Sequence, residues 1–134
     1  MRSLGLMALV LLAASGTGAE PASATRFFTN QKGSQMQYRL GPGGSISGSY
    51  ISAVGCGVGV ERRLVGWING SAITFTVSFG ECGSATSWVG HIDDAGVISS
   101  IWTLARGRDN DWNAMLTGSS VFKPDPAGGA QRVR

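Results

Sequence analysis

Residues 84–104 read SATSWVGHIDDAGVISSIWTL, two runs of alternating residues on either side of the turn at 93–96. If both runs are β-strands, their period of two places hydroxyl and indole groups on shared faces: Ser84, Thr86 and Trp88 on the first strand, and Ser100, Trp102 and Leu104 on the second. An ordinary core face carries Val, Ile and Leu, because a buried hydroxyl without a partner costs about 1–3 kcal/mol. This mixture therefore predicts a cavity whose ligand pairs with the hydroxyls while the aromatic rings supply contact area.

The chain from Arg26 onward continues this pattern, with short alternating runs, turn residues between them and no helical period. Glycine makes up 21 of the 134 residues, which favours frequent turns over helices. The expected strands cover residues 26–30, 34–40, 45–52, 62–68, 72–79, 84–92, 97–105 and 114–122. This spacing is typical of an antiparallel barrel or sandwich.

Short connections between these runs favour the barrel. Asn69-Gly70 has the composition of a two-residue hairpin turn, and only the connections at 55–61 and 106–113 are long. Strands joined in this way form an up-and-down meander, and closing the meander removes its exposed edges. We therefore predict an all-β fold, an eight-stranded antiparallel up-and-down β-barrel. Alternation assigns to its interior Ile73, Phe75, Val77 and Phe79 and, on the third strand, Gly48, Tyr50 and Ser52.

The N-terminus reads as a secretory signal. Met1-Arg2-Ser3 precedes an apolar run from Leu4 to Ala14 and then small residues, which predicts a signal peptide over 1–24 with cleavage after Ala19 or Ala24. The run is shorter than the ~20 residues that span a bilayer. We expect a secreted protein, extracellular or periplasmic, without membrane association. Its barrel domain covers 25–123, and the turn-rich residues 124–134 form a flexible tail.

Charge and cysteine content exclude several functions. The 11 basic and 8 acidic residues leave a net charge of +3, and the basic residues are scattered, which does not favour nucleic-acid binding. Export allows a disulfide between Cys56 and Cys82, worth roughly 3–4 kcal/mol on the chain-entropy model. The alternative, a metal site, lacks ligands, because only His91 could join the cysteines and zinc takes about four donors.

Five ordered segments between Phe28 and Lys123 resemble the avidin/streptavidin family of secreted biotin-binding proteins. They are NQKGS at 30–34, GSYISAVG at 48–55, SATSW at 84–88, WTL at 102–104, and Trp112 followed by Val121-Phe122. The resemblance implies the same eight-stranded barrel, which in streptavidin holds one small ligand. It also implies non-catalytic, high-affinity binding of biotin that sequesters the vitamin.

The resemblance further implies a role for each matching residue. Donors to the ureido oxygen of biotin are Asn30, Ser34 and Tyr50, and the acceptor for one ureido N–H is Ser52. Thr86 contacts the ring sulfur, while Ser84 and the backbone of Gly55-Cys56 meet the carboxylate end. The apolar box consists of Phe79, Trp88, Trp102 and Leu104, and a neighbouring subunit lends Trp112.

Three positions depart from the family pattern. Ser120 stands where the family commonly has an Asp or Asn accepting the second ureido N–H, and a hydroxyl is a shorter, neutral acceptor. Phe79 replaces a tryptophan of the apolar box, and Lys32 replaces an apolar residue near the pocket. We therefore expect biotin binding that is tight but below the family's best.

The same resemblance predicts a homo-oligomer. The placement of Cys56 and Cys82 is similar to the disulfide-stabilised dimeric branch of the family, whereas Trp112 is similar to the tetrameric branch, in which it crosses the interface. A tetramer is favoured and a dimer is the alternative. The outward residues Ile101, Thr103 and Ala105 are a candidate interface face.

Other functions fit the residues less well. A hydrolase is disfavoured, because the chain has one histidine, no activated-nucleophile signature, and carboxylates confined to turns such as Asp93-Asp94 and Asp109–Asp111. A lipocalin-like secreted carrier of another small apolar ligand would use the same barrel without the donors Asn30, Ser34 and Tyr50. An avidin-like protein with weakened biotin binding is the remaining alternative.

Overall fold

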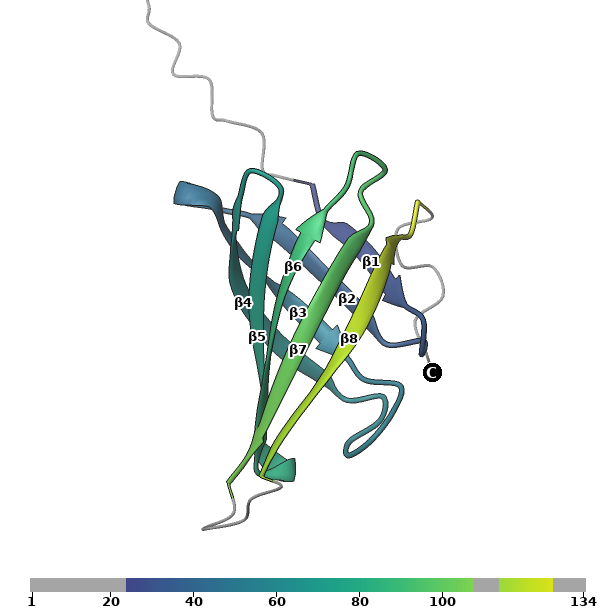
Figure 1. Ribbon diagram of the computed structural model, residues 1–134, viewed down its shortest axis with the longest axis vertical. Helices are drawn as coiled ribbons and strands as arrows, with labels where there is room; N and C mark the ends of the chain where they lie inside the picture. The colour runs from purple at the N-terminus through teal and green to yellow at the C-terminus, as the bar shows by residue number, and fades with distance from the viewer. Residues whose placement is uncertain (1–23, 108–113, 127–134) are drawn as a thin grey trace, which may run out of the picture.

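The computed structural model describes residues 24–107 and 114–126, and its eight strands form one closed antiparallel barrel (Figure 1). The strands are β1 (Arg26–Asn30), β2 (Gln35–Leu40), β3 (Ser45–Ile51), β4 (Glu61–Asn69), β5 (Ala72–Phe79), β6 (Ser84–Ile92), β7 (Ile98–Arg106) and β8 (Met115–Pro124). Two short 3-10 turns, η1 (Pro42–Gly44) and η2 (Gly80–Cys82), precede β3 and β6. Each strand pairs with the next in the sequence, and β8 returns to β1. The predicted fold class is confirmed.

The strand boundaries lie close to the predicted ones, with one difference at the C-terminus. β8 runs to Pro124, one residue past the predicted end of the barrel, and the Asp125 N–H donates to the Phe27 carbonyl at 2.8 Å. Pairing with β1 extends the strand there, because Pro124 lies opposite Phe28 and needs no N–H to fill that position. Residues 124–126 therefore adjoin the barrel wall. The rest of the predicted tail, and residues 1–23 of the predicted signal peptide, lie outside the described residues.

Tight turns set the register of neighbouring strands. Asn69 is the last residue of β4 and pairs with Ala72, so the two-residue turn is Gly70 and Ser71, one residue later than the predicted Asn69-Gly70. Gly70 occupies its first position with a φ of 59°, which favours glycine. At the β6–β7 turn, the Asp93 carboxylate accepts the backbone N–H groups of Ala95 and Val97, each at 2.9 Å. These local bonds explain the aspartate as a turn residue.

The barrel interior has an apolar part and a polar part. The buried apolar residues include Phe28, Met36, Tyr38, Ile46, Leu64, Ile73, Phe75, Val77, Ile98 and Phe122. Among the buried serine and threonine side chains, Ser34, Ser52 and Thr86 lie at the barrel end nearer the β3–β4 connection, whereas Ser100 and Ser120 form a register pair farther from it. The predicted inward parity of β3 and β5 is confirmed, since Tyr50, Ser52, Ile73, Phe75, Val77 and Phe79 are all buried. None of the helices within residues 24–107 and 114–126 is long and apolar enough to cross a membrane.

Candidate functional site

A chamber of about 550 Å³ opens at the end of the barrel where β1–β2, β3–β4 and β5–β6 are connected, the lower end in Figure 1. This volume lies within the ~300–1,000 Å³ typical of small-ligand pockets. Twelve of the thirteen predicted site residues line it: Asn30, Ser34, Tyr50, Ser52, Cys56, Phe79, Ser84, Thr86, Trp88, Trp102, Leu104 and Ser120. Trp112 lies outside the described residues. Residues from six of the eight strands and from two loops thus surround one space.

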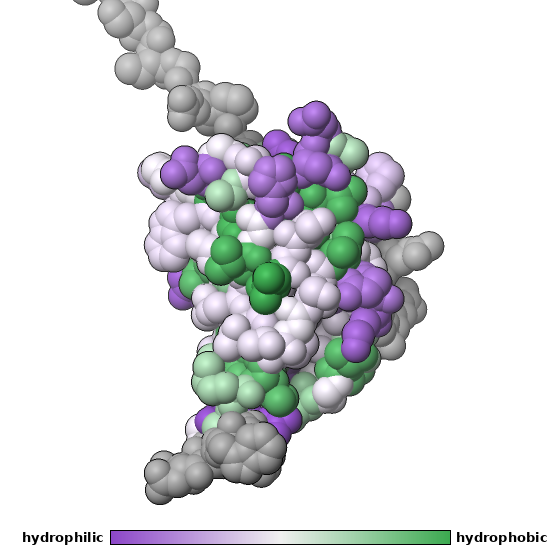
Figure 2. All heavy atoms as spheres, in the orientation of Figure 1, coloured by the Kyte–Doolittle hydropathy of each residue, from purple (hydrophilic) through white to green (hydrophobic). Residues whose placement is uncertain are grey.

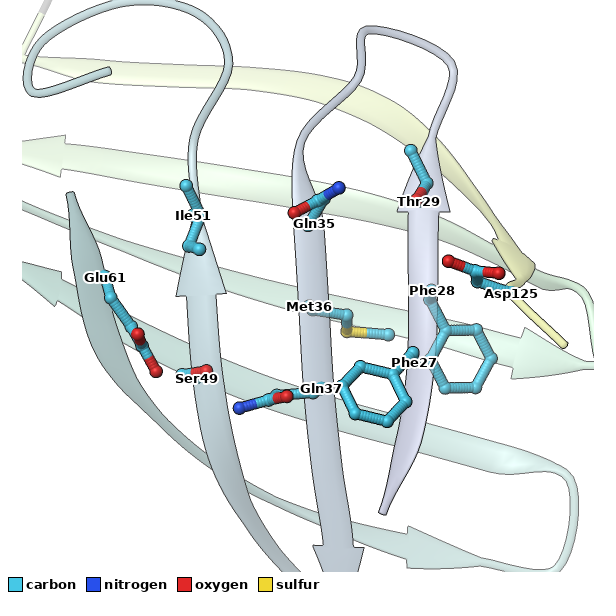
Figure 3. Close-up of a pocket in the computed structure, with 10 residues that line it drawn as sticks. All are labelled: Phe27, Phe28, Thr29, Gln35, Met36, Gln37, Ser49, Ile51, Glu61 and Asp125. Carbon is cyan, nitrogen blue, oxygen red and sulfur yellow. The ribbon is translucent and has the colours of Figure 1, made fainter. Parts of the chain in front are cut away.

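A second hollow lies on the outside of the barrel wall, over β1 to β4 (Figure 3). Its lining includes Phe27, Gln37 and Ser49, whose parity is opposite to that of the interior. The hollow has a volume of about 20 Å³, and a single water already needs about 10–15 Å³ measured in this way. It is too small for an organic ligand. The chamber is the candidate site because it gathers twelve of the predicted site residues.

The side chain of Asn30 is fixed by the turn that follows β1. Its Oδ1 accepts the backbone N–H groups of Lys32 at 3.0 Å and Ser34 at 2.9 Å. Gly33 completes this turn with a φ of 89°, a conformation that L side chains rarely adopt. Because the amide oxygen is occupied by the backbone, the Asn30 NH₂ group is the part of the side chain left to meet a ligand. Asn30 is therefore oriented as a donor.

A cluster of hydroxyls lies beside Asn30. Ser34 is 1% exposed and its Oγ accepts the Ala53 N–H at 3.0 Å. The hydroxyls of Ser34 and Ser52 lie near that of Tyr50, where they can form hydrogen bonds to its ionised form. Burial raises the pKa of the Tyr50 hydroxyl, and these two bonds offset part of the increase. Tyr50 therefore keeps its proton at physiological pH and can donate it.

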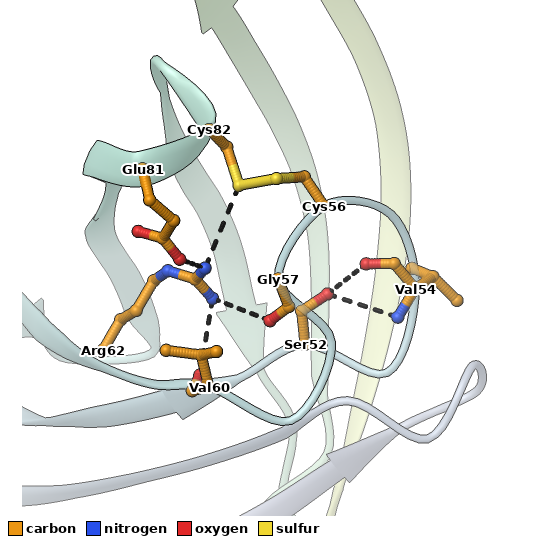
Figure 4. The surroundings of a disulfide bond; sticks show 8 residues. All are labelled: Ser52, Val54, Cys56, Gly57, Val60, Arg62, Glu81 and Cys82. Atoms are coloured by element: carbon orange, nitrogen blue, oxygen red, sulfur yellow. Dashed lines mark hydrogen bonds and ion pairs between the residues drawn. A yellow bond between two sulfur atoms is a disulfide. The ribbon is translucent and has the colours of Figure 1, made fainter.

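Ser52, in contrast to Asn30 and Tyr50, is oriented as an acceptor. Its Oγ donates to the Val54 carbonyl at 2.6 Å and accepts the Val54 N–H at 3.3 Å (Figure 4). Since its only proton is directed to Val54, a ligand meets the oxygen lone pairs of Ser52. The chamber thus presents donors on Asn30, Ser34 and Tyr50 next to an acceptor on Ser52.

Ser120 extends the polar lining on the β8 side. It is 5% exposed and lies opposite Ser100 in the β7–β8 register. The Ser100 Oγ donates to the Ser120 carbonyl at 2.8 Å, which explains the buried Ser100 without a ligand. The Ser120 hydroxyl offers a neutral acceptor to the chamber.

Aromatic rings form the remaining wall. The rings of Tyr50 and Trp88 lie 5.0 Å apart, Tyr50 meets Phe79 edge-on at 6.1 Å, and Trp88 stacks on Phe75 at 4.9 Å. Trp102 lies opposite Trp88 in the β6–β7 register. The buried Trp88 Nε1 has no hydrogen-bond partner among residues 24–107 and 114–126. Rings in this arrangement can enclose an apolar ring system.

The outer rim of the chamber is basic. Lys32 after β1 and Arg106 at the end of β7 both line it and are exposed. No Asp or Glu belongs to its lining among the described residues. The rim therefore favours a ligand whose outer end is anionic.

The disulfide predicted between Cys56 and Cys82 is present. It joins the segment 52–60, which connects β3 to β4, to η2 (Figure 4). We call residues 52–60 the mouth segment, because Ser52, Val54, Gly55 and Cys56 all line the chamber. Within residues 24–107 and 114–126, no group of three or more His, Cys, Asp or Glu side chains is placed to hold a metal ion.

Arg62 was missed by the sequence reasoning, which noted it only as one of the scattered basic residues. Its side chain is 5% exposed and contacts the mouth segment and Glu81 (Figure 4). The guanidinium also lies 4.5 Å from the centroid of the Phe79 ring. The signal that could have found it is alternation, since Arg62 shares its parity on β4 with the fully buried Leu64.

Comparisons with known proteins agree with the barrel fold. A family model described as "Avidin family" matches residues 19–125. Afifavidin from Afifella pfennigii is 35% identical over 133 residues, covering 88% of this chain and 79% of its own. The crystal structure of core-bradavidin has a TM-score of 0.72 at 29% identity, covering 76% of this chain and 100% of its own. The rhizavidin-biotin complex has a TM-score of 0.70 at 29% identity, covering 81% and 98%.

Proposed function

This chain belongs to the avidin family of non-enzymatic, biotin-binding β-barrel proteins, and from that premise we propose that the chamber holds one biotin molecule through the residues described above. The observation that carries the proposal is the set of donors and acceptor at the polar end. A cyclic urea presents one strong acceptor oxygen and two N–H donors. Asn30, Ser34 and Tyr50 supply three donors for the oxygen, and Ser52 supplies an acceptor for one N–H.

Convergence of three donors on one oxygen strengthens each of these bonds. Such an arrangement polarises the ureido group, so that the oxygen gains negative charge. Hydrogen bonds to charged groups contribute about 1.5–3 kcal/mol each, against about 0.5–1.5 kcal/mol for neutral pairs. The hydroxyl cluster is buried, and hydrogen bonds to a polarised ligand are stronger in such a low-dielectric environment than in water.

This orientation of the ureido group determines where the rest of the ligand lies. The fused rings lie among Phe79, Trp88, Trp102 and Leu104, and the ring sulfur meets Thr86. The carboxylate points outward to Ser84 and the backbone of Gly55 and Cys56, in reach of the basic rim at Lys32 and Arg106. Ser120 meets the second ureido N–H with a neutral hydroxyl, so binding is tight but below the strongest in the family.

We also propose that the chain is exported and assembles into a homo-oligomer, a tetramer in preference to a dimer. Export is supported by the signal-like segment 1–24 and the disulfide. Assembly is supported by the outer face of β6, β7 and β8, where Val89, Ile101 and Met115 are 65%, 67% and 58% exposed. In Figure 2, apolar side chains emerge among small, weakly polar ones on the face presented to the viewer. In this assembly Trp112 of one subunit would cover the chamber of its neighbour.

A crystal structure grown with excess biotin tests the proposed function. The expected result places the ureido oxygen within hydrogen-bonding distance of Asn30, Ser34 and Tyr50, with the carboxylate at the rim. A vacant chamber, or biotin bound with its ureido ring outward, would overturn the proposal. A lipocalin-like carrier would instead bind apolar ligands without contacts to these three donors.

A further inference from the structure

Arg62 is a buried cation next to the chamber and outside its lining. Its side chain is 5% exposed, and it lies opposite Tyr50 in the β3–β4 register, with both side chains directed inward. An arginine cannot lose its charge by deprotonation in a protein. A buried charge is strongly unfavourable unless partners replace its hydration, so the groups around Arg62 indicate what it holds in place.

Those groups belong to the two segments at the open end of the chamber. One guanidinium nitrogen donates to the Gly57 carbonyl at 3.2 Å and the Val60 carbonyl at 3.4 Å, both in the mouth segment (Figure 4). A second, Nη2, pairs with the Glu81 carboxylate in η2, and the buried Nε has no hydrogen-bond partner among the described residues. Arg62 therefore joins by ionic and hydrogen bonds the same two segments that Cys56–Cys82 joins covalently.

The guanidinium also lies against a wall of the chamber. Its central carbon is 4.5 Å from the centroid of the Phe79 ring, within the range of a cation–π interaction. Phe79 meets Tyr50 edge-on, so Arg62 lies behind an aromatic pair that faces the ligand. Movement of the guanidinium would release both the ring and the mouth segment.

The backbone of the mouth segment is adapted to this cation. Gly57 has a φ of 69°, and a Cβ there would collide with Arg62 Nη2 and lie 2.9 Å from Glu81 Oε1. The mouth segment thus passes close to the ion pair at a residue without a side chain.

We infer that Arg62 is a positioning residue that sets how slowly the ligand leaves, by holding the mouth segment and the Phe79 ring in their positions at the opening of the chamber. This inference rests on the proposed biotin binding. Arg62 and the disulfide both connect the mouth segment to η2, so either one partly compensates for loss of the other.

Biotin dissociation rates of the full chain test the inference. The variants are Arg62→Met, which keeps the length of the side chain, Arg62→Lys, and Arg63→Met as the matched control, because Arg63 is the exposed neighbour on β4. The dissociation rate of each variant is measured in two backgrounds. One keeps the disulfide, and the other lacks it because Cys56→Ser and Cys82→Ser are both introduced. With the disulfide, we expect Arg62→Met to speed dissociation about tenfold, Arg62→Lys to restore part of the loss, and Arg63→Met to change nothing.

Without the disulfide, we expect Arg62→Met to speed dissociation by more than the product of the two separate effects. A purely structural role would lower the unfolding temperature without this coupling. If Arg62→Met does not fold, Glu81→Gln replaces it, because Glu81 is 53% exposed and lies outside the chamber. Unchanged dissociation, or effects that merely multiply, would overturn the inference. Failure of the unmodified chain to bind biotin would instead overturn the proposed function.

Discussion

Gly118 on β8 lies directly against the indole ring of Trp102 on β7. The two residues are register partners, and a Cβ atom at position 118 would stand only 2.6 Å from Trp102 Cε2. Both line the chamber. Since no side chain separates the strand from the ring, Gly118 allows the indole to pack directly against the backbone of β8.

Gly118→Ala is therefore expected to displace the Trp102 indole into the chamber. Overpacking of this kind costs about 1–3 kcal/mol, which predicts biotin binding roughly 5- to 150-fold weaker by titration calorimetry. Gly80→Ala is the matched control, because a Cβ at Gly80 meets nothing within 4 Å and its φ is not positive. Equal affinities for the two variants would contradict the role given to Gly118.

Tyr50→Phe removes one ureido donor and keeps the aromatic ring. The loss of a hydrogen bond to a polarised oxygen, about 1.5–3 kcal/mol, predicts biotin affinity lowered by about 10- to 150-fold. The other tyrosine supplies the control, because Tyr38 is equally buried and lies outside the chamber. If Tyr38→Phe weakened binding as much, or Tyr50→Phe had no effect, the ureido assignment would be wrong.

Ser120→Asp places a charged acceptor where the chamber has a hydroxyl. A charge-assisted bond is worth about twice a neutral one, so we expect biotin to dissociate about tenfold more slowly, as measured by ligand exchange. Ser99→Asp adds the same charge on the outer face of β7, where it is exposed, and is expected to leave the rate unchanged. Faster or unchanged release from Ser120→Asp would refute the contact between Ser120 and the second ureido N–H.

Because of its two buried tyrosines, we expect the free energy of unfolding of the chain to fall at alkaline pH. Burial raises the pKa values of both Tyr38 and Tyr50 above 10.0, so the folded chain binds their protons more tightly than the unfolded chain. Their contribution is complete below pH 10 and is lost as pH rises through the folded-state values. Spectrophotometric titration should show tyrosinate forming at higher pH in the native chain than in denaturant, with biotin raising the value for Tyr50 alone. Identical titrations with and without biotin would count against a contact to Tyr50.

Local patterns predicted most of the barrel and its lining. Alternation located Tyr50, Ser52, Thr86 and Trp88 on inward faces, because a strand's faces follow directly from residue parity. The C-terminal end of β8 was placed too early, because a turn-rich composition conceals the pairing of Pro124 with β1.

Contacts between distant segments could not be predicted. The burial of Arg62 depends on Gly57, Val60 and Glu81, which converge only when the mouth segment and η2 fold against β4. Its charge alone gave no sign that Arg62 is buried. Likewise, the Asn30 amide could be assigned as a donor only after the turn showed two backbone N–H groups occupying its oxygen.

Titration calorimetry of the chain with biotin measures binding in the chamber itself. We expect saturable heat release with one biotin bound per chain, and clearly weaker binding at the same stoichiometry for Tyr50→Phe. Absence of binding heat in the unmodified chain, confirmed by failure of labelled biotin to remain with the protein on gel filtration, would contradict the proposed function.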